Sequence, residues 1–136
     1  MKIGFVGCGN MATAIIKGII KKQIIEEENI MASAKTKTTL ERVQRELGIK
    51  VSMDNSEVVK NSDIVVLAVK PQYYQEVIEQ IKDTVSDNQI IISIAPGKTL
   101  AWLQDCFGKN VKLVRTMPNT PALVGEGMTG ACRNEY

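Results

Sequence analysis

The feature that most limits the fold of this chain is a glycine-rich turn between an apolar run and a helical pattern. The apolar run is Lys2–Val6, and the turn that follows it reads Gly7-Cys8-Gly9. Beyond the turn, apolar residues recur at the spacing of one helix face, at Ala12, Ile15, Ile16 and Ile19. A buried strand that turns sharply into a helix is the opening unit of a parallel α/β sheet.

The rest of the chain repeats this alternation of short apolar runs and amphipathic stretches. Further strands are predicted at Ile30–Ala32, Lys50–Ser52, Ile64–Val69, Ile90–Ile94 and Lys112–Thr116. Helices are predicted near Thr38–Leu47, Tyr73–Asp83 and Thr99–Phe107. A brief helix, capped by Asp54 or Asn55, is predicted to run to about Lys60. With right-handed crossovers, the expected fold class is α/β: a doubly wound, Rossmann-type, mostly parallel sheet of six strands in the order 3-2-1-4-5-6. The glycine-containing segment after residue 122 shows no convincing strand or helix pattern.

Composition excludes several classes of function. The chain contains no histidine, which rules out Ser-His-Asp and Cys-His mechanisms and histidine-ligated metals. Its three cysteines are far apart, so we expect no disulfide framework, no metal site and a reducing location, the cytoplasm. The net charge of +2 lacks the basic footprint of a nucleic-acid binder, and no apolar run is long enough to span a membrane.

The turn Gly7-x-Gly9-x-x-Ala12 has the spacing of a dinucleotide-binding site. The first glycine permits the tight turn, and the second lets a pyrophosphate approach the backbone. Ala12 is small enough for the helix to pack closely on the strand. The N-terminus of the following helix offers free N–H groups and partial positive charge to phosphates. A purely structural tight turn is the alternative interpretation.

The segment after the second strand bears on which dinucleotide binds. It reads Ser33-Ala34-Lys35-Thr36-Lys37, without the acidic residue that NAD-selective sites use to hold the ribose hydroxyls. The nearest acids, Glu26 to Glu28, precede the strand and are expected at its wrong end. Hydroxyls and two ammonium groups favour a 2′-phosphate, so we expect NADP(H) to be preferred, with NAD(H) retained as a second cofactor. A solvated loop with incidental lysines is the competing interpretation.

Segments at the ends of the later strands add a resemblance. They are Ala68-Val69-Lys70-Pro71-Gln72, Ser93-Ile94-Ala95 with Gly97, and Arg115-Thr116-Met117-Pro118-Asn119-Thr120-Pro121, continuing through Gly125 to Thr129. Together with the Gly7 turn, and in this order, they resemble the pyrroline-5-carboxylate reductase family. The A-V-K-P and M-P-N-T-P segments are specific to that family, whereas the glycine turn is not.

The resemblance implies an NAD(P)H-dependent oxidoreductase acting on a C=N bond. Such an enzyme transfers hydride to the cyclic imine 1-pyrroline-5-carboxylate and gives L-proline, the last step of proline biosynthesis. A site without histidine suits this chemistry, because a protonated imine already attracts a hydride and needs no strong acid. No catalytic residue is identified from the sequence.

The resemblance also implies site residues. The pyrophosphate would lie at Gly7, Cys8, Gly9, Asn10 and Met11, and the adenosine ribose or its phosphate at Ser33, Ala34, Lys35, Thr36 and Asn55. The ribose–nicotinamide half would lie along Ala68, Val69, Lys70, Pro71, Ile94, Ala95 and Pro96. Met117, Asn119 and Thr120 would border the nicotinamide and substrate.

Several of these residues have plainer interpretations that the sequence leaves open. Asn55 could serve only as a helix cap, Lys70 as a surface charge and Pro71 as a strand end. Met117 could simply fill the core, as methionine usually does.

Two departures from the family pattern concern Pro96 and the length of the chain. Pro96 stands where the family commonly has alanine, and it removes one backbone N–H. The family has a second, helical domain that pairs subunits into a homo-oligomer and helps to bind the small-molecule substrate. We therefore expect residues 1–122 to form the NADP-binding domain, and residues 123–136 to begin the linker to a helical domain outside this sequence.

Two other functions remain open from the sequence alone. One is a different reductase on the same scaffold, of the β-hydroxyacid dehydrogenase type. The other is a non-catalytic NADP-binding module, because sheets of this kind serve many roles.

Overall fold

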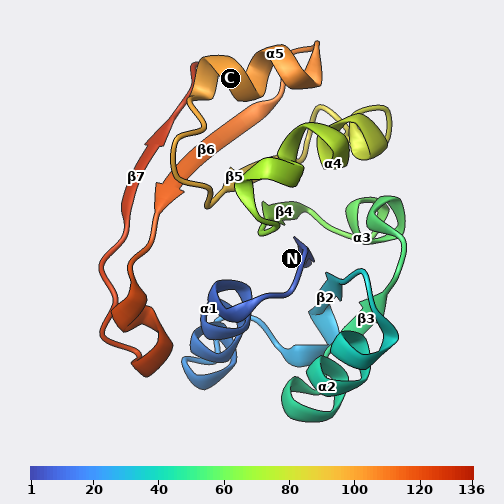
Figure 1. Cartoon of the computed structure of the whole chain (residues 1–136), viewed down its shortest axis with the longest axis vertical. Coiled ribbons are helices and arrows are strands. Elements are labelled where there is room, and N and C mark those ends of the chain that lie inside the picture. Colours follow the sequence, from blue (N-terminus) through green and yellow to red (C-terminus); the bar gives the residue numbers. More distant parts are fainter.

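Seven strands form one sheet in the order β3-β2-β1-β4-β5-β6-β7 in the computed structural model, which describes residues 1–136 (Figure 1). The strands are β1 (Ile3–Val6), β2 (Ile30–Ser33), β3 (Lys50–Ser52), β4 (Ile64–Leu67), β5 (Ile90–Ser93), β6 (Lys112–Met117) and β7 (Gly130–Arg133). All pairings among the first six strands are parallel. The predicted fold class and the order 3-2-1-4-5-6 are confirmed.

Five α-helices connect or follow the strands: α1 (Asn10–Lys21), α2 (Lys37–Leu47), α3 (Asn55–Lys60), α4 (Tyr74–Ile81) and α5 (Leu100–Phe107). Short 3₁₀ turns lie at η1 (Glu27–Asn29), η2 (Pro71–Tyr73) and η3 (Thr120–Val124). Side chains of Thr36, Asp54 and Thr99 cap the starts of α2, α3 and α5. Gly48 and Gly108 end α2 and α5 in the left-handed conformation.

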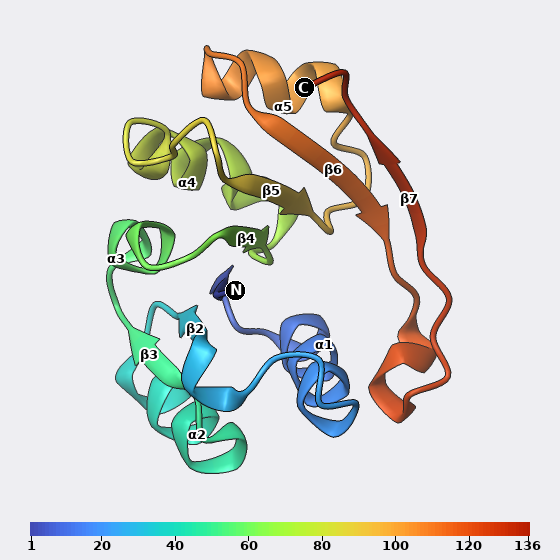
Figure 2. The same ribbon diagram turned by 180° about the vertical axis from the view of Figure 1, so that it is seen from behind.

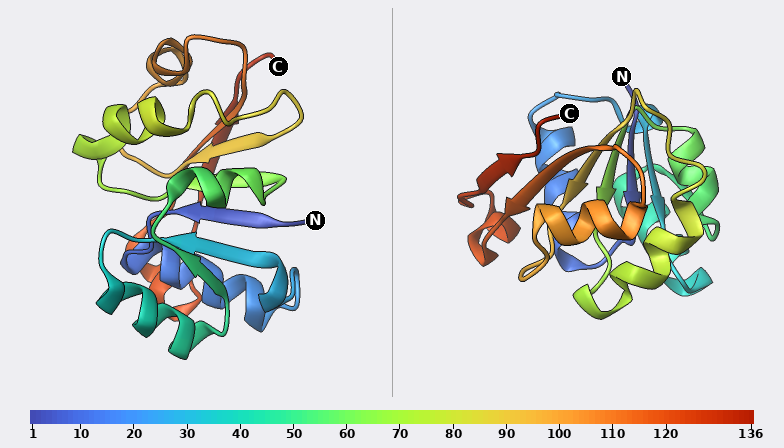
Figure 3. Two further views of the ribbon diagram at one scale, coloured as in Figure 1. Left: turned by 90° about the vertical axis from the view of Figure 1, so that its right-hand side faces the viewer. Right: turned by 90° about the horizontal axis from the view of Figure 1, so that it is seen from above.

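The sheet lies between two helix layers, and each face has its own apolar core (Figure 3). One core joins the sheet to α3, α4 and α5, and the other joins it to α1 and α2. Successive strand residues alternate between them: Phe5 belongs to one core and Val6 to the other. Both faces being covered explains why the central strands read as continuous apolar runs.

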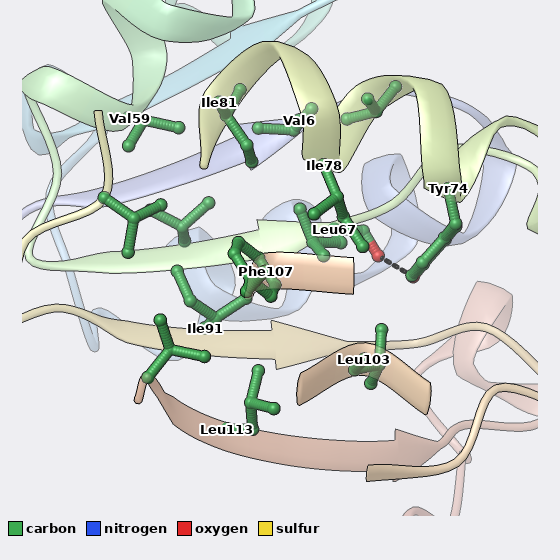
Figure 4. Packing of buried hydrophobic residues seen from close by; sticks show 14 of the residues in the cluster. Val6, Val59, Leu67, Tyr74, Ile78, Ile81, Ile91, Leu103, Phe107 and Leu113 are labelled. Atoms are coloured by element: carbon green, nitrogen blue, oxygen red, sulfur yellow. Dashed lines mark hydrogen bonds between the residues drawn. The ribbon is translucent and has the colours of Figure 1, made fainter. Parts of the chain in front are cut away.

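The core beside α4 and α5 contains large side chains with no exposed surface (Figure 4). Leu67 of β4, Ile78 of α4 and Leu103 of α5 are examples. Burying a side chain of this size contributes about 1.5–3 kcal/mol relative to leaving it in water. Packing on both faces therefore holds the strand ends, where the polar segments lie, in a defined arrangement.

The expectation of no strand after residue 122 was wrong. β7 pairs antiparallel with β6, with Val114 opposite Arg133 and Met117 opposite Gly130. All four β7 residues are exposed, so the strand has no buried face and leaves no apolar pattern in the sequence. Backbone pairing holds it, and the Asn134 side chain accepts a hydrogen bond from the Leu113 N–H at 3.1 Å. Residues 130–133 therefore belong to the sheet.

The connection between β6 and β7 folds back against α1. Its 3₁₀ turn η3 contacts α1, and both ribbon views show the two elements side by side (Figure 2). The segment that follows the last parallel strand thus lies at the same end of the sheet as the glycine turn. None of the helices combines the length and the apolar character needed to cross a membrane.

Candidate functional site

The carboxyl ends of β1, β4, β5 and β6 surround one cleft. Its volume is about 360 Å³, and its walls are Gly9, Asn10, Met11, Ala68, Val69, Lys70, Pro71, Ile94, Ala95, Pro96, Met117 and Pro118. The strand order reverses between β1 and β4, and in open α/β sheets ligands bind at this switch point. A larger hollow of about 690 Å³, beside Gln23 and Glu26 to Glu28, lies at the opposite ends of the strands.

The two turn glycines have different physical roles. Gly7 has a φ of +94°, and a Cβ there would lie 2.8 Å from Val69 Cγ1 and 3.0 Å from the Ala68 carbonyl carbon. The β1 turn therefore packs directly on the end of β4, with no room for a side chain. A Cβ at Gly9 would meet nothing within 4 Å, so this position borders open space. Gly7 shapes the turn, and Gly9 leaves its surface accessible.

The N-terminus of α1 points free hydrogen-bond donors into this space. Gly9 is the N-cap, and no side chain caps the helix. The first helical hydrogen bond runs from the Thr13 N–H to the Gly9 carbonyl at 3.0 Å, which leaves the preceding N–H groups outside the helical pattern. These donors, the helix dipole and the open surface at Gly9 fit a pyrophosphate.

Cys8 lies within the turn but faces away from the cleft. Its side chain is buried, and its Sγ lies 3.9 Å from Thr13 Oγ1. Burial raises the pKa of the thiol, which therefore stays protonated at neutral pH. Its side chain acts as a small apolar group, and the backbone of Cys8 is the part available to the turn.

Ser33 and Asn55, both predicted near the adenosine end, are joined to the glycine turn by hydrogen bonds. Ser33 is 1% exposed, and its Oγ accepts from the Gly7 N–H at 3.1 Å and donates to Asn55 Oδ1 at 2.6 Å. Asn55 Nδ2 then donates to Gln80 Oε1 at 2.9 Å. The cap of α3 is Asp54, whose Oδ1 accepts from the Ser56 N–H at 2.8 Å, so Asn55 is not merely a helix cap.

The predicted phosphate-reading loop contributes mainly two exposed lysines. Thr36 is occupied as the N-cap of α2, accepting from the Thr39 N–H at 3.3 Å. Lys35 Nζ lies 3.8 Å from the centroid of the Tyr73 ring, which orients its ammonium group across the gap between β2 and η2. Lys37 is exposed in the first turn of α2. Ala34 is half-buried.

Only one of the three residues predicted to border the nicotinamide lines the cleft. Met117 is 43% exposed and lines the cleft, so it does not fill the core. Asn119 and Thr120 are not among the lining residues. The Asn119 Oδ1 instead accepts from the Met128 N–H at 2.9 Å and closes the loop before β7, while Thr120 begins η3. A side chain that satisfies its own loop gives the same sequence signal as one that contacts a ligand.

Sequence reasoning assigned no role to three polar residues beneath the cleft: Tyr74, Ser93 and Thr116. Tyr74 is wholly buried at the start of α4, and its hydroxyl donates to the Leu67 carbonyl at 2.5 Å. Ser93 Oγ donates to the Tyr74 hydroxyl at 3.2 Å, and Thr116 Oγ1 donates to the Ser93 carbonyl at 3.0 Å. A tyrosine on the apolar face of α4 and a serine closing an apolar strand were the available signals. The residues that form this network are distant in sequence.

No group of three or more His, Cys, Asp or Glu side chains is placed to hold a metal ion. The lining residues supply apolar walls, backbone groups and one exposed ammonium, that of Lys70. Such a surface can bind, orient and exclude water, and it presents no paired acid and base.

A doubly wound sheet with an uncapped glycine turn at its switch point defines the class of dinucleotide-binding domains. A family model described as NADP oxidoreductase, coenzyme F420-dependent, matches residues 2–97. The chain belongs to this family of NADP-binding oxidoreductases.

Two relatives with the same enzyme name match most of this chain. The chain is 42% identical to the pyrroline-5-carboxylate reductase of Methanosarcina acetivorans, over 95% of this chain and 48% of the relative. It is 36% identical to the enzyme of the same name from Escherichia coli, over 98% of this chain and 49% of the relative. The chain therefore spans about half the length of the relatives it matches.

Solved structures carry the same name. A pyrroline-5-carboxylate reductase from Coxiella burnetii superposes with a TM-score of 0.94 at 36% identity, covering 98% of this chain and 50% of that one. The Plasmodium falciparum pyrroline carboxylate reductase, solved with NADP bound, gives a TM-score of 0.84 at 36% identity, covering 99% of this chain and 48% of that one. An Aquifex aeolicus prephenate dehydrogenase, at 15% identity and a TM-score of 0.73, shares the fold alone.

Proposed function

We propose that this chain is the cofactor-binding part of a pyrroline-5-carboxylate reductase. The enzyme would use NADPH, in preference to NADH, to reduce the C=N bond of 1-pyrroline-5-carboxylate and form L-proline. The observation that carries the proposal is the meeting of three distant segments at one cleft. The glycine turn, the A-V-K-P segment and the start of the M-P-N-T-P segment all line it.

The chain's own groups suit the two halves of the cofactor differently. The uncapped start of α1 would bind the pyrophosphate, and Lys35 and Lys37 would attract a 2′-phosphate as point charges. The apolar walls, including Val69, Ile94 and Met117, would hold a flat ring and exclude water from it. When bound, NADPH supplies the hydride.

A cleft without an acid–base pair suits imine reduction. Hydride adds to the imine carbon, and the C=N electron pair moves onto nitrogen, which already holds a proton in the iminium form. The protein's task is then to align two partners and to keep water away, rather than to create the electrophile.

The remaining parts of the proposal concern the whole protein. The NADP-binding domain, predicted as residues 1–122, would also include β7 (Gly130–Arg133), and the residues that follow β7 would lead to a helical domain. That domain would complete the substrate site and pair subunits into a homo-oligomer located in the cytoplasm. The catalytic proton source would belong to the substrate or to that second domain.

The first test is a calorimetric titration of the chain with NADPH and NADH. NADPH should bind at least tenfold more tightly, a difference of about 1.4 kcal/mol. The second test joins the chain to the C-terminal half of the Methanosarcina relative and follows NADPH oxidation with 1-pyrroline-5-carboxylate, identifying proline by chromatography. A fusion that folds and binds NADPH but forms no proline would contradict the proposed reaction and favour a non-catalytic module.

A further inference from the structure

A buried chain of hydrogen bonds runs directly beneath the cleft and joins three strand ends. The Tyr74 hydroxyl donates to the Leu67 carbonyl, and Ser93 Oγ donates to the Tyr74 hydroxyl. Ser93 Oγ also accepts from the Ala95 N–H at 3.4 Å, and the Ser93 carbonyl accepts from Thr116 Oγ1. The chain thus connects the last residues of β4 and β5 with β6.

The residues that follow these strand ends are the walls of the cleft. Leu67 precedes the wall that begins at Ala68, Ser93 precedes the wall formed by Ile94 and Ala95, and Thr116 precedes Met117. The backbone hydrogen bonding between β4 and β5 is weak at this point, because the Ile94 N–H donates to the Leu67 carbonyl at a long distance of 3.4 Å. The tyrosine hydroxyl therefore supplies a second, shorter bond to a carbonyl at the point where the two strands diverge.

The environment of Tyr74 keeps its hydroxyl a neutral donor. The side chain has no exposed surface, and the cluster around it includes Leu67, Ile78 and Leu103 (Figure 4). Burial raises the pKa of the phenol above its ordinary value. A polar group in such a core is costly unless it is satisfied, so its bonds confine the group to one position.

We propose that Tyr74, acting with Ser93, is a positioning residue for the nicotinamide half of the cofactor. The pair holds the ends of β4 and β5 at the separation at which both cleft walls contact the nicotinamide ring. Tyr74 itself touches neither cofactor nor substrate. The inference rests on the proposed NADPH-binding function.

The variant Tyr74→Phe removes only the hydroxyl and tests this role in the intact chain. We expect NADPH affinity to fall by about three- to tenfold, the net worth of one buried hydrogen bond. Affinity for 2′,5′-ADP, which has the adenosine half but no nicotinamide, should stay within a factor of two of the original. Amide hydrogen exchange should quicken at residues 68–70 and at Ile94, Ala95 and Gly97, and remain unchanged in α2.

Ser62→Ala is the matched control. Its hydroxyl is also buried, donating to the Val58 carbonyl at 2.7 Å, but it lies before β4, at the far end of the sheet. This variant should lose stability without losing NADPH affinity. If Tyr74→Phe fails to fold, Ser93→Ala breaks the same chain at its next link and should give the same pattern.

The outcomes separate this inference from the function on which it rests. Equal losses for NADPH and 2′,5′-ADP, or equal effects of Tyr74→Phe and Ser62→Ala, would overturn the positioning role while leaving NADPH binding intact. Failure of the unaltered chain to bind either compound would refute the proposed function, and the positioning role with it.

Discussion

The packing of the glycine turn against β4 makes a quantitative prediction for Gly7→Ala. The added methyl group would sit 2.8 Å from Val69 Cγ1 and 3.0 Å from both the carbonyl carbon and the oxygen of Ala68. The Val69 side chain can move, whereas the Ala68 backbone is fixed by the sheet, where its N–H donates to the Val6 carbonyl at 2.8 Å. The turn must therefore open if alanine is to fit.

Two costs contribute to the expected loss. Holding an L-residue at the left-handed φ of +94° costs about 1–2 kcal/mol. Forcing a methyl group into a packed site costs about 1–3 kcal/mol more. Alanine restricts the unfolded chain and returns about 0.4–1 kcal/mol. The free energy of unfolding should thus fall by about 1–5 kcal/mol, a large part of the ~5–15 kcal/mol available to a domain.

Gly48→Ala is the matched control for the clash. Gly48 also has a left-handed φ, +66°, but a Cβ there meets nothing within 4 Å. The backbone strain and the unfolded-state gain apply equally, so this variant should lose only about 0–1.6 kcal/mol. Urea unfolding followed by circular dichroism measures both free energies. The packing argument is refuted if Gly7→Ala is no less stable than Gly48→Ala.

Three further predictions concern binding and pH. Gly9→Ala should change the free energy of unfolding by no more than about 0.5 kcal/mol, because the position is open. The same variant should lower NADPH affinity at least tenfold, because the methyl group obstructs the pyrophosphate. Calorimetry showing unchanged affinity would contradict this prediction. Lys35→Ala should reduce the preference for NADPH over NADH by roughly tenfold, an effect that shrinks in high salt, and an unaltered preference would remove Lys35 from phosphate recognition. Burial raises the pKa of Tyr74, so above about pH 10 the unfolded chain releases a proton that the folded one keeps, and stability falls as pH rises. Tyr74→Phe should flatten this alkaline decline in urea unfolding, and identical slopes would contradict the assignment.

The parts of the fold that sequence could predict are those in which burial imposes a period. The strands around Phe5, Val66 and Ile91 are covered on both faces, so nearly every residue is apolar and the run can be recognised in the sequence. β7 is exposed throughout and relies on backbone pairing, which any residue can make. β7 forms because β6 lies beside it, and the short stretch of sequence around β7 does not reveal that neighbour.

The residues of the site likewise fall into those that local sequence could predict and those that only the tertiary structure places. The glycine turn was predictable because the φ of Gly7 requires glycine and the spacing of the motif is fixed, and Ser33 because it lies at the end of a strand. The actual partners of Ser33, Gly7 and Asn55, are separated from it by 26 and 22 residues. The hydrogen bond between Asn119 and its own loop, and the buried hydrogen bonds of Tyr74, likewise depend on the tertiary arrangement. The position of a residue relative to a strand end therefore located the cleft but did not identify the partner of each side chain.

The central place of β1 in the sheet has a consequence for synthesis on the ribosome. The strand pairs with β2 on one side, but on its other side it pairs with β4, where Ile3 lies opposite Ile64. At about 5–20 residues per second, the first strand waits several seconds for its second neighbour to emerge. During that interval the backbone N–H and C=O groups along that edge are unpaired and can associate with other nascent chains. We expect ribosome-bound chains ending before β4 to be captured by holding chaperones, and chains that include β4 and β5 to be released from them.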